Sequence, residues 1–293
     1  MLLILSSVFC LFSKSIYDIV LSEKTILRKS EETEKEMKNK LAEKLRKQEK
    51  PLGIFIDTAS SYVVECVGRT GFDFVIIDNE HSPVEAETSA DLIRAAELSG
   101  LTPLVRVREN SRPAVLKVLD VGAQGIVVPN IQSSDEVREL ISYCKYKPVG
   151  NRGFCPTRKD GWGYDLGLNV PDTMRYFNEQ VLLIPQCETA GALDEIEIIA
   201  DLDGVDGIFI GPYDLSIAMG IPGEFNNPVF QEALSRILSA VHRSGKFCIL
   251  FTGTAEGVVD GFQKGYDAMT YSLDAGLLID CFRERVRKIR EQV

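Results

Sequence analysis

The chain has 293 residues, 45% of them apolar and 26% charged, which excludes a disordered, a collagen-like or a polytopic membrane protein. Its formal net charge of −10 argues against nucleic-acid partners and against stable association with an anionic membrane, because both depend on Lys and Arg. The seven cysteines are scattered and form no C-x-x-C pair, which argues against a disulfide framework and a structural zinc site. We therefore expect a cytoplasmic protein in a reducing compartment.

The first part of the chain differs in composition from the rest. Residues 1–13 form an apolar run, shorter than the roughly 20 residues that span a bilayer. Residues 23–50 are strongly charged, and Leu41 and Leu45 among alternating charges are typical of an exposed helix. Since Met37 offers a second start, we expect residues 1–36 to be an extension outside the fold and residues 37–293 to form one domain. A membrane or export signal is the alternative for the apolar run.

From Pro51 onward, short apolar runs alternate with amphipathic stretches. The runs predict strands at 53–56, 74–78, 103–107, 125–129, 181–186, 207–210, 247–251 and 268–271. The stretches predict helices at 61–70, 84–99, 112–121, 134–146, 189–202, 228–243, 254–264 and 275–291. Eight alternating strands and helices predict an α/β fold, the (β/α)8 TIM barrel. The long connection 150–180 is expected to be an active-site lid.

In a TIM barrel, the chemistry takes place at the carboxyl ends of the strands. Polar residues gather there in this sequence: Asp78 and His81 after the second strand, Arg106 on the third, Gln186 and Glu188 at the fifth, and Gly211, Pro212 and Asp214 after the sixth. Acids, a histidine and an arginine at four strand ends predict a single polar site.

Glu188 and Asp214 are the candidate metal ligands. They follow neighbouring strands, and two facing carboxylates repel each other unless a cation joins them. With no His or Cys pair nearby, the donors are oxygens, which suits Mg²⁺ or Mn²⁺, admits Co²⁺ and suits zinc less well. Alternatively, the two acids cap the helices that follow them. Cys187 should point away from the site, because side chains alternate along a strand.

His81 is one of only two histidines and is the candidate general base. Its ring needs a partner to orient it, and Asp78 and Asp120 are the candidates, although Asp120 can instead simply end its helix. His242 lies within the expected helix 228–243 and should be structural.

Arg106 stands in an apolar segment, where a buried guanidinium needs an anionic partner. That partner is either a structural carboxylate or a substrate oxyanion. After the sixth strand, Gly211 and Pro212 lead into a helix whose free N–H groups can hold a carboxylate. No lysine ends a strand, since Lys246 precedes one, so a Schiff base is disfavoured. A metal and an arginine around a carbonyl indicate enolate chemistry.

Several segments together resemble the metal-dependent pyruvate aldolases of the HpcH/HpaI family, which includes 2-dehydro-3-deoxyglucarate and 4-hydroxy-2-oxoheptanedioate aldolases. They are IIDNEHSP, PLVRV, VLDVGAQGIVVPNIQ, GNRGF, PQCET and VDGIFIGPYDLSIAMG, and the similarity covers about residues 40–280. The resemblance implies a (β/α)8 barrel that converts a 4-hydroxy-2-oxo acid to pyruvate and an aldehyde, or the reverse. It also implies a homo-oligomer, commonly a hexamer or trimer of dimers, that exchanges the last helix between partners.

The resemblance implies a role for each candidate residue. Glu188 and Asp214 match the metal ligands, Arg106 the arginine at the enolate oxygen, His81 the acid/base histidine that works through a metal-bound water, Asp78 and Asp120 its supporting carboxylates, Gln186 a polar residue beside the substrate, Gly211 and Pro212 the carboxylate-binding loop, and Arg152 an arginine near the aldehyde end and at a subunit contact. The segments FCPTRKDGWGYD and FTGTAEG differ from the family pattern, so the aldehyde is not predicted.

Three other functions compete with this interpretation. One is a lyase of the same superfamily that acts on acyl-CoA esters of the citramalyl or malyl type. Another is a phosphosugar-binding barrel, in which Gly253 and Thr254 would hold the phosphate. The last is an interaction protein whose working part is the charged N-terminal helix.

Overall fold

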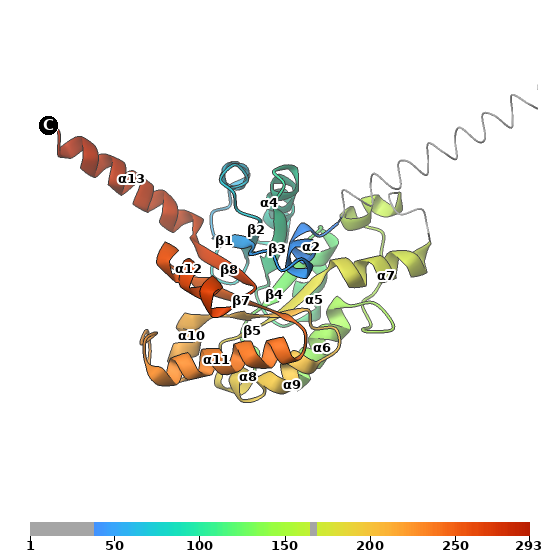
Figure 1. The fold of residues 1–293 in the computed structure, drawn as a ribbon. Coiled ribbons are helices and arrows are strands. Elements are labelled where there is room, and N and C mark those ends of the chain that lie inside the picture. The colour runs from blue at the N-terminus through green and yellow to red at the C-terminus, as the bar shows by residue number, and fades with distance from the viewer. Residues whose placement is uncertain (1–37, 165–168) are drawn as a thin grey trace, which may run out of the picture.

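The computed structural model describes residues 38–164 and 169–293, so the expected extension 1–36 lies outside the described residues. The strands form a closed parallel barrel in the order β1 to β8, with helices around it (Figure 1). The strands are β1 (Leu52–Ile56), β2 (Phe74–Asp78), β3 (Thr102–Arg106), β4 (Gly125–Val128), β5 (Leu182–Cys187), β6 (Gly207–Ile210), β7 (Phe247–Thr252) and β8 (Ala268–Leu273). The predicted TIM barrel is confirmed.

The helices that follow the strands on the outside of the barrel agree with the amphipathic pattern. They are α3 (Ser61–Val67), α4 (Ala86–Leu98), α5 (Arg112–Asp120), α6 (Ser134–Cys144), α8 (Ala190–Asp194), α9 (Ile196–Asp201), α10 (Pro212–Ala218), α11 (Pro228–Arg243), α12 (Ala255–Lys264) and α13 (Asp274–Arg290). Ser111 and Ser133 cap α5 and α6 by accepting hydrogen bonds from main-chain N–H groups three residues on. The predicted helix 189–202 is divided in two at Glu195.

The core has two layers, as expected when strand side chains alternate between the two faces of a barrel. One layer lies inside the barrel, and its ring includes Phe55, Phe74, Ile76, Leu104, Val127, Ile184, Phe209 and Ile249. The other lies between the strands and the helices. Glycine at position 53 makes room for the inner layer, because a Cβ there would collide with the ring of Phe74.

Helix α2 (Lys40–Arg46) corrects one sequence-based expectation. The charged pattern indicated an exposed helix, but Leu41 is fully buried and packs with the inner layer of the barrel. Asn39 fixes the helix by donating from Nδ2 to the carbonyl oxygens of Gln124 and Gln180, each at 2.8 Å. Since Gln124 directly precedes β4 and Gln180 lies two residues before β5, α2 closes the amino-terminal end of the barrel.

Leu41→Ala is expected to lower the free energy of unfolding by about 2–5 kcal/mol, because it leaves a cavity where α2 packs against the inner layer of the barrel. Leu98→Ala is the matched control, since Leu98 is 88% exposed at the end of α4 and its loss should cost less than about 0.5 kcal/mol. Urea denaturation followed by circular dichroism measures both. Equal losses in the free energy of unfolding for the two variants would show that α2 does not close the end of the barrel.

The connection 150–180 was expected to be a lid over the site. This prediction is wrong for the site of the same chain, because the connection lies at the other end of the barrel. The connection leads from α6 to β5, so it lies at the amino ends of the strands. It contains the 3₁₀ helix η1 (Arg158–Gly163) and α7 (Val170–Gln180). Arg158 fastens it there by donating to the carbonyl oxygen of Val121 at 3.0 Å. The predicted helix 134–146 before the segment and the predicted strand 181–186 after it already imply this end of the barrel, which the lid interpretation overlooked.

Helix α13 differs from the other long helices, because it extends away from the barrel (Figure 1). Its main contacts are with β1 and with β8, the strand that it follows directly. The helix exposes an apolar row made of Leu278, Ile279, Phe282, Val286 and Ile289. Across 38–164 and 169–293, no helix has the length and apolar character that crossing a membrane would require.

Candidate active site

A cavity of about 270 Å³ opens at the carboxyl ends of the strands. Its lining includes seven of the predicted site residues: Asp78, His81, Arg106, Gln186, Gly211, Pro212 and Asp214. Four apolar side chains complete much of the wall, namely Phe55, Phe209, Phe251 and Leu273. The structure thus brings together most of the residues that the strand-end rule selected.

Arg106 is held rigidly in this cavity by Asp78. Its Nε and Nη2 atoms donate to the two carboxylate oxygens of Asp78 at 2.7 and 2.6 Å, and its guanidinium lies 4.8 Å from the ring centre of Phe55. The remaining Nη1 lies 3.2 Å from Oε2 of Glu80. Burial acts to lower the pKa of Arg106, but the hydrogen bonds and charge of Asp78 outweigh it and raise this pKa. Arg106 therefore stays a fixed cation, with a structural carboxylate as its partner.

The same contacts correct the role expected for Asp78. Its side chain is only 1% exposed and both of its oxygens are taken by Arg106, so it does not orient His81. His81 lies at the rim with 65% of its side chain exposed, and its Nε2 is 3.8 Å from Oε2 of Glu80. That distance is an ion-pair distance for a protonated ring rather than a hydrogen bond. Among the described carboxylates, Glu80 is the one within 4 Å of the imidazole nitrogens.

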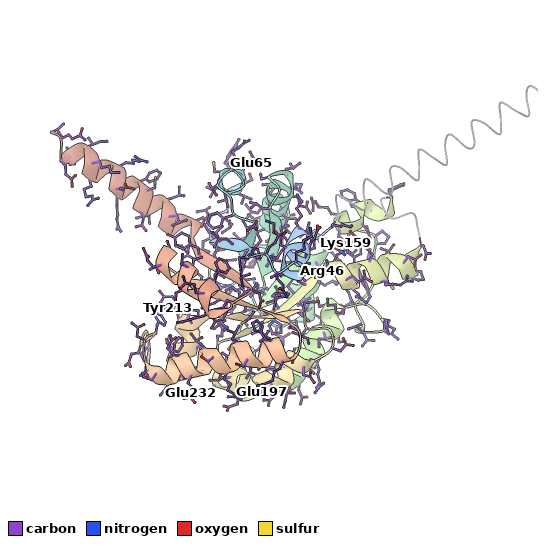
Figure 2. All side chains as sticks on the ribbon, viewed as in Figure 1. Arg46, Glu65, Lys159, Glu197, Tyr213 and Glu232 are labelled. Carbon is purple, nitrogen blue, oxygen red and sulfur yellow. The ribbon has the colours of Figure 1, made fainter. Side chains whose placement is uncertain are left out.

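Asp120 and Arg152 do not belong to this cavity within a single chain. Asp120 ends α5, a helix that runs from the carboxyl end of β3 back to the amino end of β4. There it accepts a hydrogen bond from Nη2 of Arg152 at 2.8 Å and lies 3.8 Å from Nζ of Lys159. Figure 2 shows Lys159 well apart from Tyr213, which lines the cavity. The structure therefore supports the simpler expectation that Asp120 ends its helix.

Glu188 is positioned by two neighbours. Its Oε1 accepts the main-chain N–H of Asn130 at 2.7 Å, and its Oε2 accepts from Nε2 of Gln186. Asn130 has a φ of 55°, the left-handed conformation that Asn tolerates, and this turns its N–H toward the carboxylate. Glycine at position 211 leaves room for this arrangement, because a Cβ there would lie 2.6 Å from Oε2 of Glu188 and the carboxylate would have to move.

Burial and neighbouring acids raise the pKa values of Glu188 and Glu80. Burial is the main cause that raises the pKa of Glu188 to about 7, and the charges of Glu80 and Asp214 add to it. Burial also raises the pKa of Glu80, against the opposing charges of Arg106 and His81. Three carboxyl groups, those of Glu80, Glu188 and Asp214, thus lie close together at or beside the cavity, where Arg106 is already paired with Asp78.

This arrangement fits a divalent cation. A cation beside Glu188 and Asp214 would remove their repulsion, and carboxylate oxygens are the donors that Mg²⁺ and Mn²⁺ prefer. Oε1 of Gln186 is buried without a hydrogen-bond partner in the described part of the chain, so it too can accept from a bound group. No three His, Cys, Asp or Glu side chains among the described residues form a ready metal cluster. The chain therefore offers an open site with two carboxylates, of the kind in which Mg²⁺ keeps water or substrate ligands.

Several residues of the site were missed in the sequence. Asp57 directly follows β1 and lines the cavity, so the strand-end rule could have found it. Asp274 joins the ends of β1 and β8, because Oδ1 accepts from the N–H of Asp57 at 2.9 Å and Oδ2 accepts from the N–H and hydroxyl of Thr58. The role of Asn130 depends on its main-chain conformation, which leaves no signal in the sequence.

Two predictions outside the cavity agree with the structure. Cys187 points outward into the layer between strands and helices, where it is buried beside Ile131 and Ile196. His242 lies on α11 and its Nε2 is 2.8 Å from Oδ2 of Asp267, away from the cavity lining, as expected for a structural histidine.

Comparison with known proteins gives the family. Residues 51–281 match the model of the HpcH/HpaI aldolase/citrate lyase family. A 2-keto-3-deoxy-L-rhamnonate aldolase of Escherichia coli O157:H7 is 31% identical over 250 residues, which cover 85% of this chain and 92% of that protein. These names confirm the expected enzyme class, a carbon–carbon lyase, at the level of the family.

Solved structures agree with this result. A HpcH/HpaI aldolase/citrate lyase family protein from Burkholderia cenocepacia J2315 matches with a TM-score of 0.79 and 29% identity, covering 86% of this chain and 99% of that one. The citrate synthase SbnG matches with a TM-score of 0.78 and 27% identity, over 86% and 97% of the two chains. The barrel, the cavity residues and these similarities lead to one conclusion: the chain belongs to the HpcH/HpaI aldolase/citrate lyase family.

Proposed function

We propose that this protein is a divalent-metal-dependent aldolase that cleaves a 4-hydroxy-2-oxo acid into pyruvate and an aldehyde, or catalyses the reverse reaction. The observation that carries the proposal is that a fixed cation, Arg106, and the carboxylate Asp214 line one small cavity, while Glu188 lies beside it and is bonded to the lining residue Gln186. An enolate needs cationic groups at the oxygen where negative charge develops, and this cavity offers an arginine and a place for a metal.

The metal, Mg²⁺ or Mn²⁺ held by Glu188 and Asp214, would supply Lewis-acid polarisation of the ketone oxygen when bound. Arg106 acts on the same oxygen through an N–H group that its contacts with Asp78 and Glu80 leave free, since a guanidinium carries five such groups. Because Asp78 fixes the guanidinium on two sides, its direction is set before the substrate arrives, and no energy is spent on reorienting it during the reaction. The carboxylate of the oxo acid lies at the first turn of α10, after Gly211 and Pro212, where helical N–H groups lack partners within the helix.

His81 moves the proton. In the cleavage direction, Nε2 takes the proton from the 4-hydroxyl group while the bond between C3 and C4 breaks, and in condensation it returns that proton to the aldehyde oxygen. Its exposed place at the rim lets the ring exchange protons with solvent between turnovers.

The reaction class is tested by product analysis. The protein with Mg²⁺ or Mn²⁺ is incubated with pyruvate and a panel of short aldehydes, and separately with citramalyl-CoA and malyl-CoA. A 4-hydroxy-2-oxo acid in the first set supports the proposal. Cleavage of the CoA esters alone would replace it with the acyl-CoA lyase.

The phosphosugar-binding function gains little support from the structure. Oγ1 of Thr254, the candidate phosphate ligand, accepts from the N–H of Gly257 at 3.0 Å and so caps α12 itself. An interaction role for the charged N-terminal segment stays a prediction, because most of that segment lies outside the described residues. The cysteines at 66, 144, 155, 187, 248 and 281 are free, which is compatible with the reducing cytoplasm that we propose as the location.

We further propose that the protein is a homo-oligomer that uses the apolar row on α13. The family resemblance implies a hexamer or trimer of dimers with an exchanged last helix, and an apolar helix face that leaves its own barrel is the structural feature that such an exchange requires. The resemblance also places Arg152 at a subunit contact, which stays a prediction.

Phe282→Glu is expected to shift the protein to a smaller species, because it places a charge in the centre of the apolar row. Arg287→Glu, on the polar side of the same helix, is the control and should leave the assembly intact. Size-exclusion chromatography with light scattering measures the mass of each. A monomeric wild-type protein, or an unchanged mass for Phe282→Glu, would contradict the proposal.

A further inference from the structure

Asp57 has a carboxyl group in the cavity that no other part of the site uses. It follows β1 directly and lines the cavity, and its Oδ1 is buried without a hydrogen-bond partner in the described part of the chain. The main chain at this point is fixed, because Asp274 accepts the N–H groups of both Asp57 and Thr58. Asp57 is therefore held in place while part of its carboxyl group stays free.

Arg106, the cation that lines the same cavity, forms its ion pairs with other carboxylates. The Nε and Nη2 atoms of Arg106 bond Asp78, and its Nη1 faces Glu80. Burial raises the pKa of Asp57 to about 6, the charges of Asp78 and Asp274 add to this, and Arg106 and His81 oppose it. At pH 7 and above the carboxyl group of Asp57 is mainly ionised, so its unpaired oxygen can accept a hydrogen bond. A buried acceptor without a donor is unfavourable, so a ligand that brings a donor gains affinity.

The rest of the cavity decides which donor fits. Its other walls are apolar at Phe55, Phe209 and Phe251, and its volume of about 270 Å³ admits only a small substrate. Asp57 is itself an anion without a cation partner among the described residues, so a substrate that carries a second carboxylate there meets a like charge. A neutral hydroxyl group both supplies a proton to Asp57 and avoids this repulsion.

We propose that Asp57 determines specificity, by accepting a hydrogen bond from a hydroxyl group on the aldehyde half of the substrate. The enzyme then prefers short hydroxyaldehydes over aldehydes without a hydroxyl group and over aldehydes that carry a carboxylate. This inference rests on the proposed aldolase function and names the substrate class of the same site.

Three two-carbon aldehydes test it, because they differ in one group: acetaldehyde, glycolaldehyde and glyoxylate. Condensation of each with pyruvate is followed for the wild type, Asp57→Ala, Asp57→Asn and Asp57→Glu. Wild-type kcat/KM should be about 10- to 100-fold higher for glycolaldehyde than for acetaldehyde, and lowest for glyoxylate. Asp57→Ala should reduce the ratio of kcat/KM for glycolaldehyde to that for acetaldehyde to within roughly threefold. Asp57→Asn should raise kcat/KM for glyoxylate relative to that for acetaldehyde. Asp57→Glu should keep part of the preference.

Because each ratio is taken within one variant, a general loss of activity or stability cancels. Asp260→Asn, which removes the same charge from an exposed position on α12, should keep the wild-type ratios. A wild type that prefers acetaldehyde or glyoxylate, or ratios that Asp57→Ala and Asp57→Asn leave unchanged, overturns the inference while the aldolase assignment stands. A wild type that neither enolises pyruvate nor condenses any aldehyde overturns the proposed function itself.

Discussion

Replacing Glu188 by Gln is expected to lower kcat/KM by about 1,000-fold or more and to weaken Mn²⁺ binding. The variant keeps the size of the side chain and an oxygen for the N–H of Asn130, but it removes one of the two negative charges that would hold the cation. A metal contributes several kcal/mol of stabilisation to a developing oxyanion, and each 1.4 kcal/mol corresponds to a factor of ten in rate. Steady-state kinetics and calorimetric titration with Mn²⁺ measure the two effects.

Glu197→Gln is the matched control. Glu197 lies on α9, apart from Tyr213 of the cavity lining (Figure 2), and its ion pair with Arg236 is exposed. This variant should keep wild-type activity and metal affinity. Full activity of Glu188→Gln would refute the role of Glu188 as a metal ligand.

The pH dependence of the metal-free protein gives Glu188→Gln a second readout. Burial raises the pKa of Glu188 to about 7 in the folded protein, above its ordinary value of 4.5, so the unfolded chain loses this proton first. Ionisation therefore destabilises the folded protein as pH rises from about 4.5 through 7, by up to about 3 kcal/mol. At pH 8 without metal, the Gln variant should be at least as stable as the wild type, and at pH 4 the difference should vanish. A Gln variant that is clearly less stable than the wild type at pH 8 would contradict this account.

The metal affinity of the wild type should also fall below about pH 7, because protons compete with the metal for the carboxylate of Glu188.

The second large effect is expected from Asp78→Asn, which disrupts the pair that fixes Arg106. Breaking a buried pair leaves a charge without compensation and costs about 3–5 kcal/mol, and here the lower value is expected because Glu80 lies 3.2 Å from the guanidinium. Arg106 also loses its preset direction, so kcat/KM for aldol cleavage should fall by about 100-fold, mainly through kcat. Urea denaturation and steady-state kinetics measure the two losses.

The pair between Arg236 and Glu197 shows why burial decides this result. It has the same two-pronged geometry, with Nε to Oε1 at 3.0 Å and Nη2 to Oε2 at 2.7 Å, but both side chains are more than 40% exposed. Glu197→Gln should therefore cost less than about 1 kcal/mol. Equal destabilisation by Asp78→Asn and Glu197→Gln would show that the buried pair has no special role.

The fold follows closely from the sequence, because each barrel strand is a short buried run that has its own local signal. The predicted strands at 74–78 and 207–210 coincide with β2 and β6. Helix α2 was misjudged for a physical reason. Its charged pattern describes the surface that faces solvent, whereas the closure of the barrel end by a helix is a property of the whole fold. The sequence therefore shows that Leu41 is apolar but not what it fills.

The sequence predicts which residues line the cavity wherever the strand-end rule alone determines their position. It does not predict which side chain each of them bonds. Arg106, Gln186 and Asp214 line the cavity as expected. Asp78 also lines it, but spacing along the chain cannot show that its carboxylate faces Arg106 rather than His81. Asp120 was misplaced because it ends a helix, and helices in a βα unit run toward the opposite end of the barrel.

The central claim, that this cavity enolises pyruvate with the help of a metal, has a direct test that needs no knowledge of the aldehyde. The protein is incubated with pyruvate in D₂O, and the methyl protons are followed by NMR with Mg²⁺ or Mn²⁺ and again with EDTA. We predict loss of the methyl signal that depends on the metal and is abolished in Glu188→Gln. A methyl signal that persists with every divalent metal tested would contradict the account.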